Sequence, residues 1–588
     1  MVPRAQVSSF VGRDFLVLIV KLLLGELVMS TKLTGSQIVC QALLNEGVEV
    51  VFGLPGGAIL PLYGVLRQFP QLKHVLVRHE QGAAHAADGY SRSTGKVGVA
   101  FATSGPGATN LITGLATAMM DSAPLVAITG QVGRSAIGTD AFQETDITGA
   151  TLPVTKHNYL VMRADDIGKT IHEAFYIART GRPGPVLIDI PKDVFQEEAY
   201  YDPDVLVTIP GYTVPTKANL PDVVDAVDLI NSSDRPVILA GHGVIISKAH
   251  NELKTLSEKS QIPVVTTLLG ISSFPEDHIL SCGFPGMHGL AYASLILDQS
   301  DLIIGIGTRF DDRIVGDPKR FSVSSKKIHI DIDKSEIGKT VKIDVPVIGN
   351  IRHVLKQMNP KIIKKNRPEW IGHVEDLKRQ HPSLDIPKSD HLLGQRVIRT
   401  LSDVTKGDAI ICSGVGQHQM WAAQHFTFTE PNSWISSGGL GTMGFEVPSA
   451  IGAQMGNPNK LVWSICGDGG FQMTMMELAT AKENNLPVKY GILNNNHLGM
   501  ITQWQGLFYD HDYQAETYSG NPDFVKLAEA YGIKGIRVTN EKDLLASILE
   551  ANGHPGPVIV DFVIEKVDNV YPMIPAGQSI SELIEENA

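Results

Sequence analysis

Two short segments in the last third of the chain place oxygen-bearing side chains directly after apolar runs. Asp468 stands between Gly467 and Gly469, and a later apolar run ends in consecutive asparagines at 494–496. A carboxylate, an amide oxygen and a backbone carbonyl are the hard ligands that Mg²⁺ takes beside phosphate groups. Each segment alone fits a tight turn or a helix cap. Together they predict a magnesium site that anchors a diphosphate at the carboxyl ends of parallel strands.

A further carboxylate lies far away in the sequence, in the first third of the chain. Glu80 follows the apolar run 75–77 and begins an Ala- and Gly-rich stretch, 80–90, which predicts a closely packed helix. A glutamate in the first turn of a helix often does no more than interact with the helix dipole. The same position also suits a carboxylate that shares a proton with a bound cofactor.

The elements that must position these residues are short apolar, β-branched runs that alternate with helical stretches. Continuous apolar strands of this kind are typical of parallel sheets covered by helices on both faces, so the predicted fold class is α/β with doubly wound parallel sheets. The expected strands lie at 50–52, 97–102, 125–129, 186–190, 236–240, 264–267, 302–306, 327–332, 409–412, 461–466, 488–493 and 558–562.

Several domains are expected, because 588 residues are too many for one hydrophobic core. Two proline-containing linkers, 195–220 and 359–390, delimit domains at 32–197, 218–358 and 390–566, which a tail at 567–588 follows. A Pro-Gly-Pro turn at 183–185 precedes one apolar run, and another at 555–557 precedes the last. Chance could produce this repeat; otherwise it indicates that the first and third domains share one fold.

The composition excludes some classes of function. The net charge of −12 disfavours a nucleic-acid-binding protein, because no basic surface is available to displace counterions from phosphates. The cysteines form no CxxC pair, which predicts buried thiols in a reducing compartment and neither disulfides nor a zinc site. They are Cys40, Cys282, Cys412 and Cys466.

The N-terminal residues need separate treatment. The apolar stretch 15–28 is interrupted by Lys21 and Glu26, and it is too short to span a bilayer. Globular patterning begins near Thr34. We therefore expect residues 1–31 to be an extension, disordered or the product of a misassigned start, and we expect no membrane association.

Beyond these patterns, Gly-Asp-Gly followed by Asn-Asn resembles the signature of enzymes that bind thiamine diphosphate. Further segments resemble the large subunits of acetohydroxyacid (acetolactate) synthases, and this similarity extends over 32–578. The segments lie at 139–144, 156–159, 309–313, 414–421, 436–444 and 499–504. The resemblance implies a pyrimidine-binding first domain, an FAD-binding central domain and a diphosphate-binding third domain.

The resemblance also implies roles for individual residues around thiamine diphosphate. Asp468, Asn495 and the carbonyl of His497 would hold Mg²⁺. Glu80 would lie beside the aminopyrimidine ring, and Met443 would support the bent cofactor. The other implied cofactor contacts are Gln417, His418, Gly467, Gly469 and Met500.

Residues near the reacting centre are implied in the same way. Trp504 would recognise the second substrate, and the residues lining the channel would be Gly57, Phe142, Gln143 and Lys156. Gly133 stands where many relatives have proline, which leaves the shape of that channel edge open.

In the central domain, Gly305-Ile-Gly307 after an apolar run is only an incomplete dinucleotide motif. The wider set of segments resembles the FAD site of the anabolic synthases, and the catabolic, flavin-free enzymes lack the Arg-Phe-Asp-Asp-Arg pattern at 309–313. The implied FAD contacts are Arg182, Thr267, Leu268, His288, Arg309, Asp312, Arg313 and Asp331. The flavin would be structural, because the reaction transfers no electrons.

The implied reaction decarboxylates pyruvate and joins the two-carbon unit to a second pyruvate or to 2-oxobutyrate. The products are 2-acetolactate and 2-aceto-2-hydroxybutyrate, in the first common step of branched-chain amino acid biosynthesis. The family builds each site from two chains, so we expect a homodimer or a dimer of dimers and a separate small regulatory subunit. The expected compartment is bacterial cytoplasm or plastid stroma.

Other functions are compatible with part of this pattern. An FAD-linked pyruvate oxidase shares the main motifs, but the segments 309–313 and 499–504 disfavour it. Glyoxylate carboligases also resemble the chain but lack the catalytic glutamate. A non-catalytic nucleotide-binding protein is disfavoured by the presence of Glu80, Asp468 and Asn495.

Overall fold

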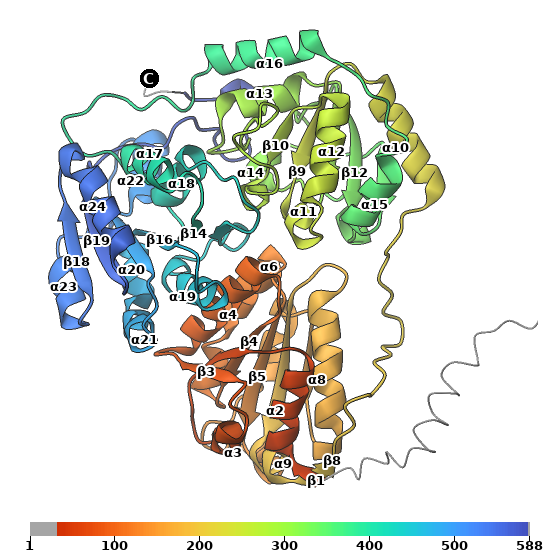
Figure 1. The fold of residues 1–588 in the computed structure, drawn as a ribbon, viewed down its shortest axis with the longest axis vertical. Coiled ribbons are helices and arrows are strands. Elements are labelled where there is room, and N and C mark those ends of the chain that lie inside the picture. Colours follow the sequence, from red (N-terminus) through yellow and green to blue (C-terminus); the bar gives the residue numbers. More distant parts are fainter. Residues whose placement is uncertain (1–31, 586–588) are drawn as a thin grey trace, which may run out of the picture.

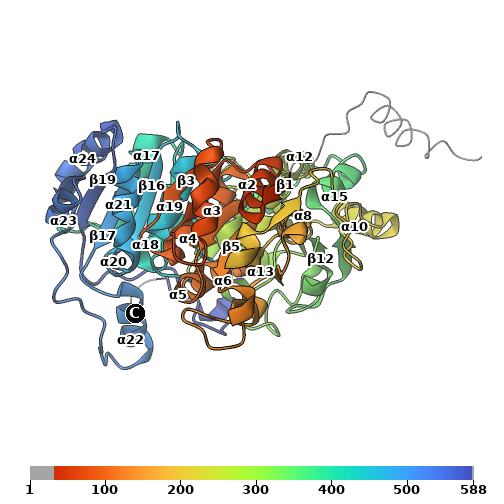
Figure 2. The same cartoon turned by 90° about the horizontal axis from the view of Figure 1, so that it is seen from below.

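The computed structural model describes residues 32–585, and the expected extension at 1–31 lies outside them. Within this range the chain forms three domains, each built on one parallel sheet with helices on its faces (Figure 1). The predicted fold class is therefore confirmed. The central and third domains lie side by side, with the first domain below both of them in the view of Figure 1, and Figure 2 shows the same arrangement from below, with the first domain in front.

The first domain contains a six-stranded parallel sheet in the order β3-β2-β4-β5-β7-β6. Its strands are β2 (Val50–Gly53), β3 (Lys73–Leu76), β4 (Gly98–Ala102), β5 (Leu125–Gln131), β6 (His157–Leu160) and β7 (Pro185–Pro191). Its helices are α2 (Gly35–Asn45), α3 (Leu60–Val65), α4 (Glu80–Thr94), α5 (Pro106–Thr109), α6 (Ile112–Asp121), α7 (Ile147–Thr151), α8 (Ala164–Arg179) and α9 (Lys192–Gln196). A short antiparallel pair, β1 (Lys32–Thr34) with β8 (Glu198–Tyr200), closes the domain.

The central domain has a five-stranded sheet in the order β10-β9-β11-β12-β13. Its strands are β9 (Pro236–Ala240), β10 (Val264–Thr266), β11 (Leu302–Ile306), β12 (Lys326–Asp331) and β13 (Val345–Ile348). Its helices are α10 (Leu220–Ser232), α11 (His242–Ile246), α12 (His250–Ser260), α13 (Ala291–Gln299), α14 (Asp312–Val315), α15 (Ile351–Met358) and α16 (Pro368–Gln380). Separate buried clusters fill the two faces of this sheet.

The third domain repeats the first, with the sheet order β15-β14-β16-β17-β19-β18. Its strands are β14 (Ile410–Ser413), β15 (Trp434–Ser436), β16 (Val462–Gly467), β17 (Lys489–Asn494), β18 (Lys534–Val538) and β19 (Val558–Val563). Its helices are α17 (Gly394–Thr405), α18 (Gln417–His425), α19 (Glu446–Gly456), α20 (Asp468–Thr474), α21 (Leu478–Glu483), α22 (Gly499–Phe508), α23 (Phe524–Ala530) and α24 (Glu541–Gly553).

The repeated Pro-Gly-Pro turn leads into equivalent strands of these two sheets, β7 and β19. Each strand carries a buried aspartate that bonds to the neighbouring strand. Asp189 accepts hydrogen bonds from Thr129 and Gln131, at 2.7 and 2.9 Å. Asp561 accepts one from Asn494 at 2.9 Å. The shared strand order and these matching contacts support one fold for both domains.

One of the two predicted linkers contains a helix. The predicted linker 195–220 begins within α9 and includes β8, so only residues 201–219 of it are turns and irregular chain, whereas the stretch 359–390 includes α16. The interpretation of that whole stretch as linker was wrong, because Trp370, Val374 and Leu377 recur at helical spacing and bury one face of α16 against the central domain. The indole of Trp370 also donates a 2.9 Å hydrogen bond to the carbonyl of Pro236.

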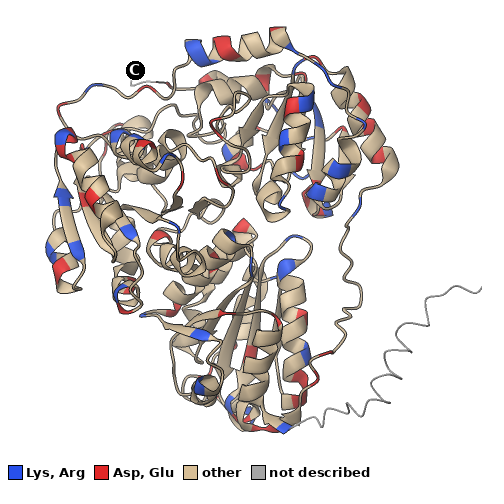
Figure 3. Ribbon diagram, viewed as in Figure 1, with Lys and Arg blue, Asp and Glu red and all other residues tan. Residues whose placement is uncertain are grey.

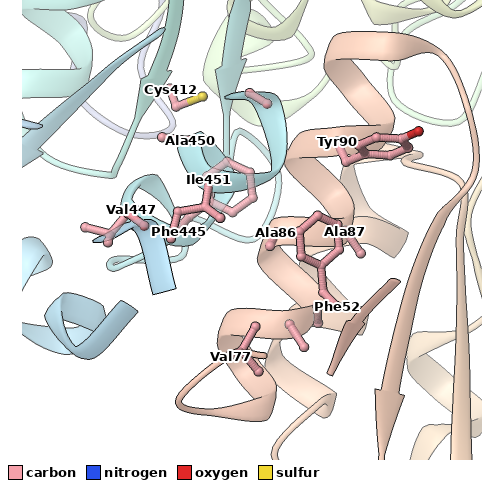
Figure 4. Packing of buried hydrophobic residues seen from close by; sticks show 14 of the residues in the cluster. Phe52, Val77, Ala86, Ala87, Tyr90, Cys412, Phe445, Val447, Ala450 and Ile451 are labelled. Atoms are coloured by element: carbon pink, nitrogen blue, oxygen red, sulfur yellow. The ribbon is translucent and has the colours of Figure 1, made fainter. Parts of the chain in front are cut away.

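The first and third domains share a hydrophobic core. Helix α4 packs along α19, and Figure 4 shows Ala86 on the side of α4 that faces Ile451 of α19, whereas Ala87 and Tyr90 lie on the side toward Phe52 of the first sheet. Glycines permit this close approach: a Cβ at position 89 would collide with the carbonyl of Ser449, and one at position 452 with the carbonyl of Ala86. The catalytic candidate Glu80, at the start of α4, therefore belongs to a helix anchored in both domains.

The surface mixes charges of both signs. Lys and Arg are interspersed with Asp and Glu on the outer helices in the view of Figure 3. Between residues 32 and 585, every helix is too short or too polar to traverse a bilayer.

Candidate active site

Asp468 and Asn495 follow two strands that are neighbours in the third sheet. Strand β16 ends at Gly467, which pairs with Leu493 near the end of β17. Both side chains are buried, with 2% of Asp468 and 6% of Asn495 exposed. The structure thus brings the carboxylate and the amide to one edge of the sheet.

Asp468 is the first residue of α20, and a 3-10 turn at Met475–Glu477 separates α20 from α21. Its Oδ1 accepts a 3.0 Å bond from the amide of Gly469, and its Oδ2 accepts a 2.7 Å bond from Nδ2 of Asn521. Burial raises the pKa of Asp468 to about 6, and these bonds offset part of that rise. Asn521 was not predicted, because its segment carries no motif.

The asparagine run forms a tight turn. Asn496 has a φ of 59°, a left-handed value that asparagine tolerates better than most residues. Oδ1 of Asn495 accepts a 3.0 Å bond from the amide of His497. Residues 32–585 contain no cluster of three or more His, Cys, Asp or Glu side chains suited to a metal. A cation here would therefore depend on one carboxylate, one amide and backbone carbonyls.

One cavity of about 710 Å³ lies beside this edge. A volume of this size is typical of cofactor and small-molecule sites. Its walls contain most residues that the resemblance assigned to either cofactor. These are Gln417, His418, Met443, Gly467, Asp468, Gly469, Asn495, His497, Met500 and Trp504 from the third domain, and Arg182, Thr267, Leu268, His288, Arg309, Arg313 and Asp331 around the central domain.

Two of the third-domain residues begin α18. Nε2 of Gln417 donates a 2.7 Å bond to the carbonyl of Asp568. The ring of His418 lies against Gly416 and Gly467, and its buried Nε2 has no hydrogen-bond partner in the described chain. Burial lowers the pKa of His418 to about 3, so the ring is neutral. An unpartnered ring nitrogen in a cavity wall is available to a ligand.

Met443 lies in the cavity wall on the loop 437–445, and the first domain holds this loop in place. The carboxylate of Asp121 accepts bonds from the amides of Gly438 and Gly439, at 3.1 and 2.7 Å. Asp121 also pairs at 3.0 Å with the buried guanidinium of Arg92. Asp121 was not predicted, since its role depends on contacts between domains.

On the central-domain side, Arg182 donates a 2.7 Å bond to the buried carboxylate of Glu336. The hydroxyl of Thr267 accepts from the amide of Gly270 at 2.9 Å and so starts the turn that presents Leu268. Burial lowers the pKa of His288 to about 4 and raises that of Asp331 to about 6. These groups form a polar wall around an otherwise apolar cavity.

The segment 309–313 is anchored by its phenylalanine. Phe310 has a φ of 49° and is 1% exposed, with its ring packed against Gly305. This buried ring holds Arg309 and Asp311 in the cavity wall, where their side chains approach to 3.5 Å. Asp312, which the sequence favoured, points away from this cavity and lines a smaller pocket, with 78% of its side chain exposed.

The carboxylate of Glu80 lies outside the walls of this cavity. It is 6% exposed, and Oε2 accepts a 2.9 Å bond from Nδ2 of Asn110. The loops after β2, β4 and β5 meet at the same edge of the first sheet. They carry Gly57, which is exposed; Phe142, which is 88% exposed; and Gln143, which packs against Gly105. In a single chain, therefore, Glu80 and Asp468 belong to separate surfaces.

Lys156 is also outside the cavity walls. Its ammonium donates to the carbonyl of Thr180 at 2.8 Å and to the hydroxyl of Tyr212 at 3.2 Å. Burial lowers its pKa to about 8. In one chain this lysine binds the C-terminal end of α8.

Trp504 and Met500 project from α22 into the cavity wall. The edge of the Trp504 indole packs on Phe508, with ring centroids 5.8 Å apart, and its Nε1 has no partner in the described chain. Part of this large apolar surface therefore remains available to a small molecule.

Comparisons with known families match each domain in order. The N-terminal TPP binding domain of thiamine pyrophosphate enzymes matches residues 33–150, the central domain matches 223–358, and the C-terminal TPP binding domain matches 414–562.

Individual relatives are similar over nearly their whole length. The acetolactate synthase large subunit of Corynebacterium glutamicum is 47% identical over 563 residues, which cover 94% of this chain and 90% of that protein. The acetolactate synthase of Mycobacterium bovis is 48% identical, with 94% and 91% covered. The large subunit from Lactococcus lactis is 44% identical, with 94% and 96% covered.

Proposed function

Because the chain belongs to the thiamine pyrophosphate enzymes, and within them to the acetolactate synthase large subunits, we propose that it joins two 2-oxo acids. Two molecules of pyruvate give 2-acetolactate and CO₂, and pyruvate with 2-oxobutyrate gives 2-aceto-2-hydroxybutyrate and CO₂. The observation that carries this proposal is the edge formed by Asp468 and Asn495 beside a cofactor-sized cavity, in a chain that aligns with these synthases almost from end to end.

The proposed cofactor is thiamine diphosphate with Mg²⁺. Asp468, Asn495 and the carbonyl of His497 would hold the metal, and the amides at the start of α20 suit a diphosphate. The buried, unpartnered Nε2 of His418 beside Gly467 supports a ligand at this place. When bound, this cofactor supplies a carbon nucleophile and accepts the electrons released with CO₂.

The protein residues have separate tasks in this reaction. Glu80 would hold a proton at the pyrimidine nitrogen N1′ of the bound cofactor. Gln417, His418, Met443 and Met500 position the cofactor, and Trp504 contacts the second 2-oxo acid. The channel residues are Gly57, Phe142, Gln143 and Lys156, and they keep water away from the reacting carbon.

We propose that two chains complete each site, because Glu80 emerges outside the cavity of its own chain, on an edge that exposes Phe142. Mixed dimers test this arrangement. A chain with Glu80→Gln and one with Asp468→Ala should each be inactive alone, yet the purified heterodimer should retain one intact site and about half the wild-type activity. An inactive heterodimer would contradict a shared site.

The central-domain side of the cavity supports FAD as a structural cofactor. Arg309 and Asp311 stand in its wall on a segment anchored by Phe310, and the neutral His288 has a buried nitrogen without a partner. Since the relatives are named large subunits, a separate small regulatory subunit is also proposed. The proposed compartment is the bacterial cytoplasm or the plastid stroma.

The activity test uses the purified full-length chain with pyruvate, thiamine diphosphate, Mg²⁺ and FAD. Acetolactate formed without oxygen uptake supports the proposal. Peroxide with oxygen uptake would identify a pyruvate oxidase instead, and bound cofactors without any product would indicate a non-catalytic protein.

A further inference from the structure

A buried carboxylate of the third domain, Glu477, holds the turn that immediately precedes Glu80 in the first domain. Its Oε1 accepts hydrogen bonds from the amides of Arg78 and His79, at 2.9 and 3.0 Å. Its Oε2 accepts a 2.6 Å bond from the hydroxyl of Thr480. Glu477 is 1% exposed, and hydrogen bonds to a charged group are strong in such an interior.

Neighbouring residues reinforce this contact. A Cβ at position 82, in the first turn of α4, would collide with the carboxylate of Glu477, so the glycine there is required for the fit. Thr480 bonds to the carbonyl of Leu76 at 3.3 Å, and Arg78 forms a 2.8 Å ion pair with Glu483. We call residues 475–483 the clamp, because they hold both the end of β3 and the start of α4.

The clamp is continuous with the metal edge of its own chain. It follows α20 directly, and α20 begins at Asp468. One short segment therefore connects Asp468 of a chain to Glu80 of the same chain. If each site combines Glu80 of one chain with Asp468 of its partner, these two residues serve different sites.

We propose that Glu477 is a positioning residue for Glu80. Through this contact, the third domain of one chain sets the position of Glu80 in the active site whose cofactor the partner chain binds. This inference rests on the shared site proposed above. Its physical basis is that Glu80 is the first residue of α4, so the amides of Arg78 and His79 fix its place. A displacement of about 1 Å at such a group can cost about 100-fold in rate.

A purely structural role makes a different prediction. Glu477 could instead secure α20 and hence Asp468 of its own chain. If Glu477 positions Glu80, its loss impairs one active site of the dimer; if it secures Asp468, its loss impairs the other. Mixed dimers can therefore distinguish the two roles. In the heterodimer described above, the intact site takes Glu80 from the Asp468→Ala chain and Asp468 from the Glu80→Gln chain.

The experiment adds Glu477→Ala to one chain of this heterodimer at a time and measures acetolactate formation and thiamine diphosphate affinity. Placed in the Asp468→Ala chain, the substitution should lower kcat by about tenfold or more, with cofactor affinity unchanged, because it releases the only useful Glu80. Placed in the Glu80→Gln chain, it should leave most activity. The reverse pattern, or equal losses from both placements, would overturn the proposal.

Controls separate folding from positioning. Glu477→Gln keeps an acceptor for the amides of Arg78 and His79 and should restore most of the lost kcat. Glu483→Gln removes only the partly exposed ion pair of the clamp and should change little. Failure of Glu477→Gln to restore activity in a heterodimer with an unchanged melting temperature would also count against positioning. If the heterodimer without Glu477→Ala is inactive, the shared site fails instead.

Discussion

Asn521 donates a 2.7 Å hydrogen bond to Oδ2 of Asp468 and lies 3.0 Å from Oδ1 of Asn496. It thus orients the proposed metal ligand from a different segment of the chain. Replacing Asn521 by Ala should weaken Mg²⁺-dependent binding of thiamine diphosphate by about 10- to 100-fold, as the loss of an outer partner usually does. Equilibrium binding at varied Mg²⁺ measures this effect.

Asn45→Ala is the matched control, since Asn45 makes a 2.8 Å bond to Tyr201 far from the cavity. It should leave binding unchanged. Equal affinities for Asn521→Ala and the wild-type protein would show that Asp468 needs no such partner.

The role of Glu80 predicts a specific loss. Glu80→Gln keeps the size of the side chain and can still bond to Asn110, but it cannot exchange a proton. The rate of cofactor deprotonation, followed by hydrogen exchange at the thiazolium carbon, should fall by about 100-fold or more, and cofactor affinity should change little. An unchanged exchange rate would remove Glu80 from the mechanism.

Continuous apolar runs predicted every central strand of the three sheets. Apart from β3, of which only the apolar run 75–77 was recognised, the strands of these sheets that escaped prediction are β6, β13, β15 and β18, and each lies at the edge of its sheet. An edge strand has one unpaired side, and three of these four are partly exposed, so their residues show no unbroken apolar run. Burial on both faces, and not strand propensity, made the others recognisable.

Without the family resemblance, the candidate site was predictable only where its residues follow strands in short motifs. Asp468 and Asn495 carry that signal, and so does Glu80. Asn521, Asp121 and Glu477 act through contacts between segments or domains, which spacing along the chain cannot reveal. Asp312 was named from the family resemblance alone, and its neighbour Asp311 is the aspartate that lines this cavity.

Trp504 predicts a change in substrate choice. Trp504→Leu removes aromatic surface from the cavity wall and should reduce the preference for 2-oxobutyrate over pyruvate by about 10-fold, within the range for lost apolar contact with a substrate. Competition assays with both 2-oxo acids measure the product ratio. Phe508→Leu is the control, because it alters the ring beside Trp504 that lies outside the cavity wall, and it should preserve the product ratio. Equal ratios in the wild-type protein, Trp504→Leu and Phe508→Leu would exclude a role of Trp504 in substrate choice.

Arg309 predicts the strength of flavin binding. Its guanidinium stands in the cavity wall beside Asp311. Arg309→Gln should lower FAD affinity by about tenfold or more, because one charged contact to the flavin nucleotide is lost. Flavin fluorescence after gel filtration measures the bound fraction. Arg163→Gln is the control, because it breaks an exposed ion pair with Asp165, and it should retain the flavin. Full retention of FAD by Arg309→Gln would mean that the flavin does not bind beside Arg309.

Glu446 is buried beside α20, the helix that begins at Asp468, and it has no charged partner. It is 0% exposed, and its carboxyl group lies between Gly414 and Gly470, where a Cβ at position 470 would come within 2.7 Å of Oε1. Neither carboxyl oxygen has a partner with good hydrogen-bond geometry in the described chain. Burial raises the pKa of Glu446 to about 8, although the nearby amides of Gly444 and Glu446 lower it in part.

This shift fixes the sign of a pH effect on stability. Glu446 ionises near pH 4.5 in the unfolded chain and near 8 in the folded one, so the folded state holds an extra proton between these values and stability falls as pH rises through them. Glu446→Gln cannot ionise, so at pH 8–9 it should be more stable than the wild-type protein, by about 2 kcal/mol or more. At pH 5 the two proteins should have similar stability.

Calorimetric melting at both pH values measures this difference in stability, with Glu369→Gln on the surface of α16 as the control. Parallel pH profiles for the wild-type protein and Glu446→Gln would contradict this prediction, because they would mean that Glu446 is already charged in the folded protein.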